Sequence, residues 1–367
     1  MSRLEKTSAH LNNIFPFSAE NSRQNLHGHF QAGPQRRQAE RKRSNMKSAL
    51  LVRFGGLGDL LVALPSMRLI RRTYPDAHLA LACRTTYGKL LVDAGVVDEL
   101  IREDSPRLLP LFEEGPAAGA SAGGGLGDCD LVIGWSHGGS RHFAKPGNVQ
   151  KRTAGEVHFL NADLQGSSPL SRQFFKKTAE AIGASGDLAI EEYASFPAGQ
   201  LRKGGGSGSM SGQGAGRRGV IAHPGSGSES KRWPLENFLS VIRRLGERGV
   251  AGTLVTGEAE ERLEPGLEKA VLSPGWTWSR QPRLTDLASD LSQAALYLGN
   301  DSGVTHLAAA CGAEVIALFR QDFLAAWRPL GRVSVLAAPS LVEIPPESVW
   351  EILASRLPNF SAYSQNS

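Results

Sequence analysis

The sequence predicts an α/β protein built from two Rossmann-like domains that face each other across a cleft. From residue 48 onward, short apolar stretches typical of buried strands alternate with stretches whose apolar residues recur at helical spacing. This is the pattern of parallel sheets with crossover helices. The alternation stops in a Gly/Ser-rich stretch at 203–216 and then starts again. A chain of 367 residues is long enough for two such domains, each with its own core.

The first series of elements begins with the apolar stretch at 49–54, which we expect to be a buried strand. A glycine-rich turn then leads into a helix with leucines at helical spacing, which Pro65 is expected to kink or interrupt. Further strands are expected at 78–83 and 130–135. The Gly/Ala-rich stretch at 113–128 between them is expected to be a surface loop.

The second series repeats the pattern after the Gly/Ser-rich stretch. Its first helix is expected to start near Pro234 and to end at Gly249, as proline and glycine favour those two ends. Strands are expected within 219–225, 252–257, 295–300 and 313–319, and helices within 234–249, 284–294, 303–312 and 345–357.

The predicted organisation has five parts. They are a disordered basic extension at 1–45, an N-terminal Rossmann-like domain at 46–202, a Gly/Ser linker at 203–216, a C-terminal Rossmann-like domain at 217–345, and a C-terminal helix and tail at 346–367. No apolar segment follows the charges of the extension, so a targeting role is disfavoured. Met46 directly precedes the first strand, so the alternative is that translation starts there.

The net charge of +5 lies entirely in the extension, which holds eight Lys/Arg against three Glu. The rest of the chain is neutral, so the charge does not favour a nucleic-acid partner. Three cysteines lie far apart without metal-ligand spacing, which indicates a reducing compartment. No stretch reaches the roughly 20 apolar residues of a spanning helix. We therefore expect a cytoplasmic protein, whose contact with the inner membrane would be peripheral.

The first motif is the glycine-rich turn at 53–66, in which Asp59 falls at the start of a helix. The helix dipole and free backbone N–H groups stabilise a carboxylate there. An ordinary helix-capping aspartate is the alternative. The turn is neither a dinucleotide fingerprint nor a phosphate-binding loop with its Gly-Lys-Ser/Thr.

The second motif, at 223–234, places the hydroxyls of Ser226 and Ser228 just ahead of Lys231 and Arg232. Hydroxyls and N–H groups bind phosphate oxygens, and a cation neutralises their charge, so the motif suits a diphosphate. A solvated basic turn is the alternative.

The third motif, at 299–312, is the most informative. Asn300, Asp301 and Ser302 precede an apolar helix, and Gly303 allows close approach of another backbone. Such a helix N-terminus binds anions. His306 would lie one turn into this helix, facing the cleft, either as a ligand or as a packed core histidine.

Asp128 and Asp130 resemble the metal-binding Asp-x-Asp found in one class of glycosyltransferases. They directly precede a strand, where paired acidic residues are common, so a metal role is disfavoured. We expect no metal and no cofactor.

Taken in order, four segments resemble glycosyltransferase family 9, the heptosyltransferases of lipopolysaccharide core assembly. The resemblance covers 48–335 and is carried by 56–81, 223–234, 255–261 and 300–312. It implies the two-domain GT-B architecture, with 46–202 as the acceptor domain and 217–345 as the donor (nucleotide-sugar) domain. It also implies inverting, metal-independent transfer of heptose, usually from ADP-heptose, to a membrane-anchored glycolipid.

The resemblance also implies roles for individual residues. The family's catalytic base matches Asp59, with Gly58 and Arg141 on the acceptor side. The donor-binding set combines the resemblance with the serines of the second motif and comprises Ser226, Ser228, Lys231, Glu260, Asp301, Ser302, Gly303, Val304 and His306.

One segment departs from the family pattern. The family commonly has Phe-Gly-Pro-Thr-Asp-Pro ahead of a tryptophan, whereas this chain keeps Phe319 and Trp327 and replaces the residues between them. Arg320 and Asp322 are therefore expected in a donor-side loop of altered chemistry. Three alternatives stay open: an enzyme that uses another nucleotide sugar, a non-catalytic nucleotide-sugar-binding protein, and a nucleic-acid-binding protein that uses the extension.

Overall fold

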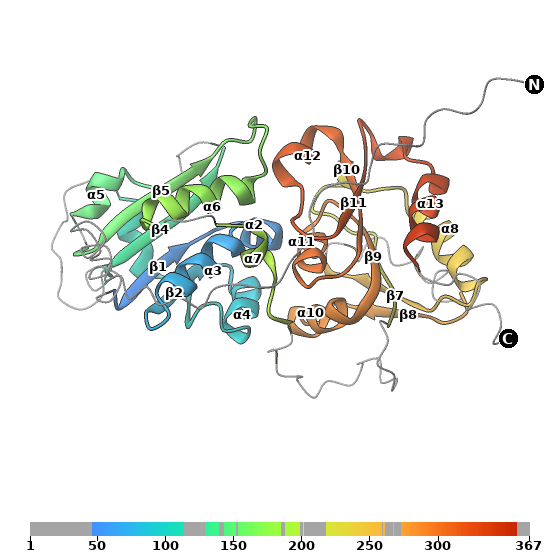
Figure 1. Cartoon of the computed structure of the whole chain (residues 1–367), viewed down its shortest axis with the longest axis horizontal. Helices are drawn as coiled ribbons and strands as arrows, with labels where there is room; N and C mark the ends of the chain where they lie inside the picture. Colours follow the sequence, from blue (N-terminus) through green and yellow to red (C-terminus); the bar gives the residue numbers. More distant parts are fainter. Residues whose placement is uncertain are drawn as a thin grey trace, which may run out of the picture.

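The computed structural model contains two parallel β-sheets in separate halves of the molecule (Figure 1). It describes residues 46–113, 126, 129–138, 143–151, 153–184, 188–198, 201, 218–258, 260, 267 and 273–357. The predicted fold class, α/β with two Rossmann-like parts, is confirmed. The extension at 1–45 and the linker at 203–216 lie outside the described residues, and the division into acceptor and donor domains stays a prediction.

The amino-terminal sheet has the strand order β3-β2-β1-β4-β5, and all neighbouring strands are parallel. Its strands are β1 (Ser48–Val52), β2 (His78–Cys83), β3 (Glu99–Arg102), β4 (Leu131–His137) and β5 (Glu156–Ala162). The central strands are apolar on both faces, because helices cover both sides of a parallel sheet. On one face Leu50 and Val52 pack beneath Leu108, and on the other Leu51 packs with Phe174.

Helices and 3₁₀ turns complete this half. They are α2 (Leu57–Val62), α3 (Leu64–Thr73), α4 (Thr85–Asp93), η1 (Pro106–Leu111), α5 (Pro146–Gln150), α6 (Leu170–Ala181) and α7 (Glu191–Ala194). The predicted interruption near Pro65 is confirmed, since α2 ends before Ala63 and Pro65 is the second residue of α3. A proline has no N–H to donate, so it fits best in the first turn of a new helix.

The carboxy-terminal sheet has the strand order β11-β10-β9-β6-β7-β8 and is also parallel. Its strands are β6 (Arg218–His223), β7 (Gly252–Thr256), β8 (Trp276–Arg280), β9 (Ala294–Asn300), β10 (Val315–Arg320) and β11 (Val333–Ala338). The other elements are η4 (Glu229–Lys231), α8 (Leu235–Gly246), α10 (Leu284–Gln293), α11 (Gly303–Ala310), α12 (Gln321–Trp327), η6 (Leu341–Glu343) and α13 (Pro346–Arg356).

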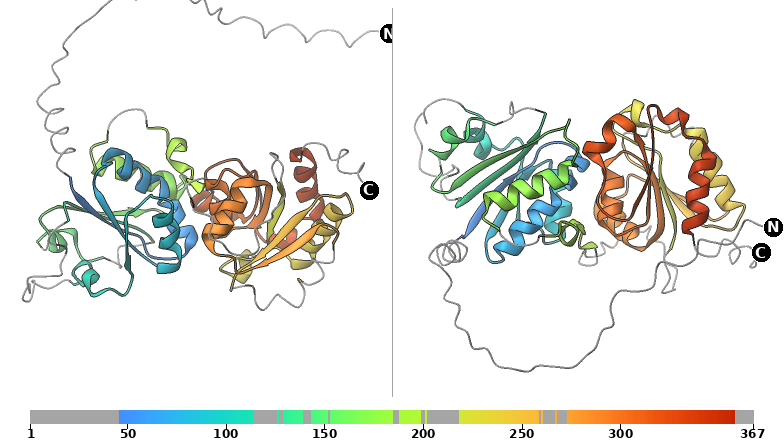
Figure 2. Two further views of the ribbon diagram at one scale, coloured as in Figure 1. Left: turned by 90° about the horizontal axis from the view of Figure 1, so that it is seen from below. Right: turned by 45° about the horizontal axis from the view of Figure 1, so that its top comes forward.

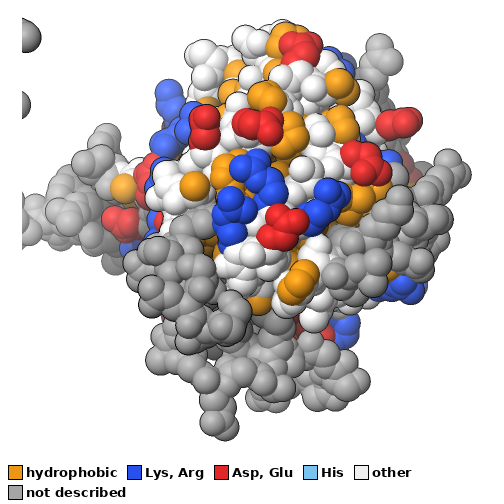
Figure 3. Space-filling model, turned by 90° about the vertical axis from the view of Figure 1, so that its right-hand side faces the viewer, with side chains coloured by type: hydrophobic (Ala, Val, Ile, Leu, Met, Phe, Trp, Pro, Cys, Tyr) orange, Lys and Arg blue, Asp and Glu red, His pale blue; other side chains and the backbone are white. Residues whose placement is uncertain are grey.

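Helices cover both faces of this sheet. Helices α8 and α13 pack on its outer face, where Phe238 and Leu353 are buried. Helices α10 and α11 pack on the other face, toward the amino-terminal half (Figure 1). The outer end of this half carries Lys and Arg side chains next to Asp and Glu (Figure 3). Arg244 of α8 lies 4.0 Å from Glu347 of α13. This end therefore does not present a single sign of charge.

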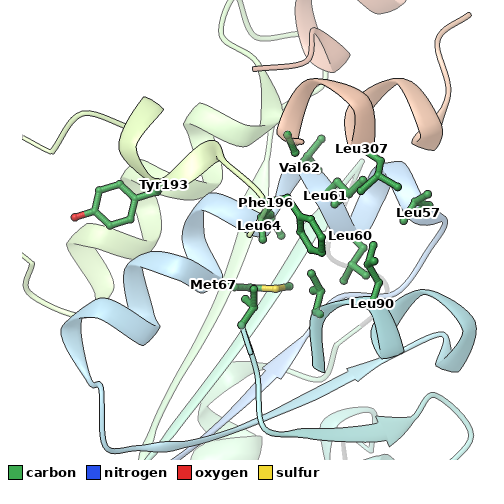
Figure 4. Close-up of a cluster of buried hydrophobic side chains, with 14 of the residues drawn as sticks. Leu57, Leu60, Leu61, Val62, Leu64, Met67, Leu90, Tyr193, Phe196 and Leu307 are labelled. Carbon is green, nitrogen blue, oxygen red and sulfur yellow. The ribbon is translucent and has the colours of Figure 1, made fainter. Parts of the chain in front are cut away.

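The two halves meet where α2 packs against α11, and the views in Figure 2 agree on this junction. Figure 4 shows Leu307 of α11 next to Leu61 and Val62 of α2. The backbone N–H of Phe196 also donates to the carbonyl of Ala310 at 2.7 Å. Apolar side chains of both halves thus belong to one continuous core. No helix in the described part of the chain is long and apolar enough to cross a membrane.

Candidate active site

The candidate site lies where the carboxyl ends of strands from both sheets approach each other. In open α/β sheets, loops at these ends carry the binding and catalytic groups. From the amino-terminal half come the turn after β1 and the last residue of β4, His137. From the other half come the turns after β6 and β9 and helix α12, which follows β10.

Asp59 is the third residue of α2, and its carboxylate receives three hydrogen bonds. Arg53 Nη2 lies 2.7 Å from Oδ1, and His137 Nε2 lies 2.9 Å from the same oxygen. The backbone N–H of Gly56 donates to Oδ2 at 2.9 Å, so Asp59 also caps its own helix. Gly55 has φ +120°, and a Cβ there would lie 2.6 Å from Asp59 Cγ. This turn therefore requires glycine.

These contacts set the charge of Asp59. Burial alone would raise the pKa of the carboxyl, but the hydrogen bond from His137, the charge of Arg53 and the N–H of Gly56 together lower it below its ordinary value. Arg53 is only 4% exposed, and burial lowers the pKa of its guanidinium while Asp59 opposes that change. Asp59 is 24% exposed and ionised at neutral pH, so it can be reached as a proton acceptor.

The carboxy-terminal half contributes a second ion pair. Lys231 Nζ lies 2.7 Å from Asp301 Oδ2, and the lysine side chain is 22% exposed while the aspartate is 5% exposed. The ammonium also lies over two rings of α12, 4.2 Å from the centroid of Phe323 and 5.9 Å from that of Trp327. The face of an aromatic ring attracts a cation, so these rings help to hold Lys231.

The serines of the predicted donor site have different surroundings. Ser226 is buried, and its Oγ donates to the carbonyl of Asp301 at 2.8 Å. Ser302 caps α11, since its Oγ accepts from the N–H of Thr305 at 3.3 Å. Ser228 is exposed, and its hydroxyl lies 2.9 Å from the hydroxyl of Ser230. Ser226 and Ser302 thus stabilise the turns that surround the site.

Asn300, the last residue of β9, fixes the turn after β6. Its side-chain amide donates to the carbonyl of Pro224 at 2.8 Å, and its Oδ1 accepts from the N–H of Trp233 at 3.0 Å. The residue is fully buried, so both bonds are shielded from water. This clamp holds the segment that carries Lys231 against the start of α11.

His306 lies one turn into α11, as the sequence predicts, and is buried. Burial lowers the pKa of its ring, and this outweighs the opposing charges of Asp301 and Asp59, so the ring is neutral at neutral pH. Its Nε2 has no hydrogen-bond partner among the described residues. A Cβ built at Gly58 would lie 3.7 Å from His306 Cδ2, so this ring is adjacent to the acceptor-side turn.

Gly303 and Val304 lie at the start of α11. A Cβ at Gly303 would lie 2.7 Å from Leu57 Cβ and 2.8 Å from the backbone nitrogen of Gly58, so this contact between the halves requires glycine. Val304 is partly buried against the shared core. Arg141 lies outside the described residues.

Glu260 is buried beneath the turn that follows β6. Its Oε2 accepts from the N–H of Gly257 at 2.7 Å and lies 3.7 Å from Nε2 of His223. Burial opposes ionisation, but His223 and the Gly257 N–H keep the pKa of this carboxyl below its ordinary value. A Cβ at Gly225 would lie 2.2 Å from Glu260 Oε1, so glycine is needed where this turn covers the carboxylate.

The segment between Phe319 and Trp327 is not the loop that the sequence analysis predicts. Arg320 ends β10 and Asp322 lies in the first turn of α12, so this segment is a helix rather than a loop. Asp322 pairs with Arg320 at 2.6 Å and adds a negative charge near the helix N-terminus. Both side chains are accounted for by local pairing.

Asp130 has a structural role at the start of β4. Its Oδ2 accepts from the backbone N–H groups of Lys47 at 2.7 Å and of Ser48 at 3.0 Å. Asp128 lies outside the described residues. In the described part of the chain, no group of three or more His, Cys, Asp or Glu side chains could hold a metal ion.

Three residues of the site were not assigned roles from the sequence: Arg53, His137 and Trp327. The ring of Trp327 lies 5.3 Å from that of His137, edge to face, and 6.5 Å from that of His306. Contacts therefore run from Asp59 through His137 and Trp327 to Lys231. His137 could have been found from its place at the end of a predicted strand.

Comparisons with known proteins identify the family of the chain and its fold. The family model for glycosyltransferase family 9 (heptosyltransferase) matches residues 151–338, just over half of the chain. No curated protein sequence matches the chain.

Several solved structures share the fold. The E. coli heptosyltransferase WaaC with ADP superposes with a TM-score of 0.59 and 17% identity, covering 84% of this chain and 100% of that one. The E. coli ADP-heptose lps heptosyltransferase II gives the same score, identity and share of this chain, with 98% of its own chain covered. A family 9 glycosyltransferase from Veillonella parvula also has a TM-score of 0.59 and 17% identity, and the match covers 84% of this chain and 96% of that one. At this identity the likeness is one of fold.

Proposed function

Because the chain belongs to glycosyltransferase family 9, we propose that it is an inverting heptosyltransferase that uses ADP-heptose. The acceptor in this proposal is a sugar of a lipopolysaccharide-core or related glycolipid anchored in the inner membrane. The enzyme would work from the cytoplasm, with at most peripheral contact with the membrane. Two structures of E. coli WaaC, which has the same fold, are named as holding ADP and ADP-2-deoxy-2-fluoro heptose, which supports this donor class.

The observation that carries the proposal is a reachable carboxylate linked to a reachable cation across the two halves. Asp59 and Lys231 come from different halves, and His137 and Trp327, whose rings meet edge to face, connect them. Glycosyl transfer needs both a proton acceptor for the attacking hydroxyl and a positive charge for the departing diphosphate. This arrangement supplies one from each half.

In the proposed mechanism the acceptor hydroxyl attacks the anomeric carbon of the donor in line with the departing group. The O–H bond breaks and its proton passes to Asp59, while a new C–O bond forms at the anomeric carbon. The bond from that carbon to the diphosphate breaks, and the electron pair leaves with ADP. Lys231 and the N–H groups at the start of α11 stabilise the negative charge that develops. No metal ion takes part in this scheme.

A second candidate is a homologue that binds a different nucleotide sugar, either to transfer it or without catalysis. One observation favours it: α12 replaces the family's usual loop, and Phe323 covers the ammonium of Lys231. A donor diphosphate would have to share Lys231 with this ring. The residues of α12 that would lie beside the donor therefore differ from the family pattern.

The test is calorimetric titration of residues 46–367 with ADP, UDP, GDP and CMP, alongside Lys231→Ala. We expect selective binding of ADP and about 10- to 100-fold weaker binding by the variant, as for loss of one charge-assisted hydrogen bond. Lys89→Ala is the matched control, because Lys89 pairs with Asp93 on the surface of α4. Preference for another nucleotide would contradict the heptose assignment and favour the second candidate. Binding of none of the four would contradict the proposed donor site.

A further inference from the structure

The hydrogen bond between Asp59 and His137 joins two adjacent strands of the amino-terminal sheet. Asp59 follows β1, and His137 is the last residue of β4, the strand paired with β1. Nε2 of His137 lies 2.9 Å from Oδ1, the oxygen that also binds Arg53. The histidine side chain is 26% exposed and lies at the junction of the halves. No role is assigned to it in the mechanism above.

The direction of this hydrogen bond follows from the charge of Asp59. An ionised carboxylate has no proton to donate, so it can only accept. Nε2 of His137 must therefore carry the proton and donate it to Oδ1. Asp59 thus selects the protonated form of this nitrogen, much as a buried carboxylate orients the histidine of a catalytic triad.

The three donors leave few places on Asp59 for a substrate. Each carboxylate oxygen has two lone-pair positions, so Arg53 and His137 together occupy Oδ1. The Gly56 N–H occupies one position on Oδ2. The remaining position on Oδ2 is the one that can take the acceptor's proton. Anything that rotates the carboxylate moves this position.

We propose that His137 is a positioning residue that holds Asp59 with its free Oδ2 lone pair toward the acceptor hydroxyl. The proposal rests on the proposed function of Asp59 as the general base. The ring of His137 is itself held edge to face against Trp327, with the planes at 84°. Trp327 belongs to the carboxy-terminal half and lies beside Lys231. The packing of this half against the amino-terminal half therefore also fixes the orientation of Asp59.

The test compares two substitutions of His137 in the 46–367 protein. Glutamine can place an amide N–H near the position of Nε2, whereas phenylalanine keeps the ring shape and donates nothing. For His137→Phe we expect kcat to fall on the order of 10²-fold, because small misplacement of a reacting group has effects of this size. The KM for ADP-heptose should stay close to that of the unchanged protein. His137→Gln should recover most of kcat.

The pH profile separates positioning from a merely structural role. Arg53, His137, the Gly56 N–H and the more distant His306 face Asp59. Removing the His137 donor takes away one group that favours the ionised carboxylate. The acidic limb of the pH profile of kcat should therefore move to higher pH in His137→Phe. It should not move in His137→Gln. The control is His78→Phe, since His78 pairs with Glu99 at 3.0 Å at the opposite ends of the strands.

A second readout needs no substrate. In ¹⁵N-labelled protein, the His137 ring should show a proton on Nε2, and this signal should change on Asp59→Asn and not on Asp98→Asn. Unchanged kcat and acidic limb in His137→Phe would overturn the proposal, as would a ring with Nε2 unprotonated. Failure of the proposed function would be seen separately, as absence of transfer by the unchanged protein or full transfer by Asp59→Asn.

Discussion

The two ion pairs of the site are built alike but buried in opposite senses. In each pair a nitrogen lies 2.7 Å from a carboxylate oxygen. In the amino-terminal half the cation, Arg53, is 4% exposed and the carboxylate, Asp59, is 24% exposed. In the carboxy-terminal half the carboxylate, Asp301, is 5% exposed and the cation, Lys231, is 22% exposed. Each half thus buries one partner, which we call the hidden group, and leaves the other partly exposed, which we call the presented group.

The difference shows how one kind of interaction can serve two chemical needs. A hidden cation keeps the presented carboxylate ionised, which suits a proton acceptor. A hidden carboxylate holds the presented ammonium in place, which suits a group that binds phosphate. The hidden partner also has little freedom to move, so the presented group is held in position before any substrate arrives.

Asp59→Asn should have the largest effect, because it removes the presented charge of the first pair. We expect kcat for transfer to fall by about 10²–10⁴-fold, the usual contribution of a general base. Asparagine keeps the size of the side chain, so calorimetric binding of ADP should stay unchanged. Asp98→Asn, which removes a carboxylate paired with Arg71 away from the site, is the control. Near-normal turnover by Asp59→Asn would end the assignment of the base.

Arg53→Met breaks the same pair from its hidden side, and its effect should be seen in stability. Removing one partner of a buried pair destabilises a fold by about 3–5 kcal/mol, and the lower end applies because Asp59 is partly exposed. Urea unfolding at pH 7 would measure the change. Arg102→Met, which removes an exposed partner of Asp104, should have little effect.

The pH dependence of this loss follows from the lowered pKa of Asp59. A carboxyl whose pKa is lower in the folded state stabilises the fold above its ordinary value of 3.8, and this contribution is lost as the pH falls through the folded-state pKa. The difference in unfolding free energy between the unchanged protein and Arg53→Met should therefore shrink when the pH is lowered from 7 to about 3. A constant difference would contradict this role of the pair.

Phe323→Ala should have the smallest effect. It would test whether the Phe323 ring competes with the nucleotide for the ammonium of Lys231. A cation over a ring at a partly exposed site gains about 0.5–1 kcal/mol. Freeing the ammonium from Phe323 should therefore tighten ADP binding by about 2- to 5-fold in the calorimeter. Leu324→Ala, a neighbouring change on α12, serves as the control. Weaker binding by Phe323→Ala would instead mean that this ring contacts the nucleotide.

The sequence predicts the framework and the presented groups better than the hidden ones. Strands, helices and the break at Pro65 follow from local patterns of apolar residues and from the chemistry of proline. Asp59 and Lys231 stand in turns directly after predicted strands, so their approach to a cleft could be expected. Arg53 lies within an apolar strand end, and only the folded sheet shows that it turns back onto Asp59.

Contacts between the halves are the part that the sequence does not predict. His137 and Trp327 are 190 residues apart, and their rings meet only because α12 lies against the end of β4. Comparison with the family pattern suggested a loop at Arg320 and Asp322. The residues between them and Trp327 form helices readily, and local pairing and the apolar side of α12 favour the helix.

The packing of α2 on α11 has a consequence for how the protein responds to heat. Leu61 and Val62 are covered by Leu307 of the other half, so separating the halves would expose a wide apolar surface to water. Unfolding of one half alone would expose this apolar surface of the other half to water. The described parts of both halves should therefore unfold in one cooperative transition. A nucleotide that binds only to the carboxy-terminal half would therefore also raise the melting temperature of the amino-terminal half, which carries Asp59.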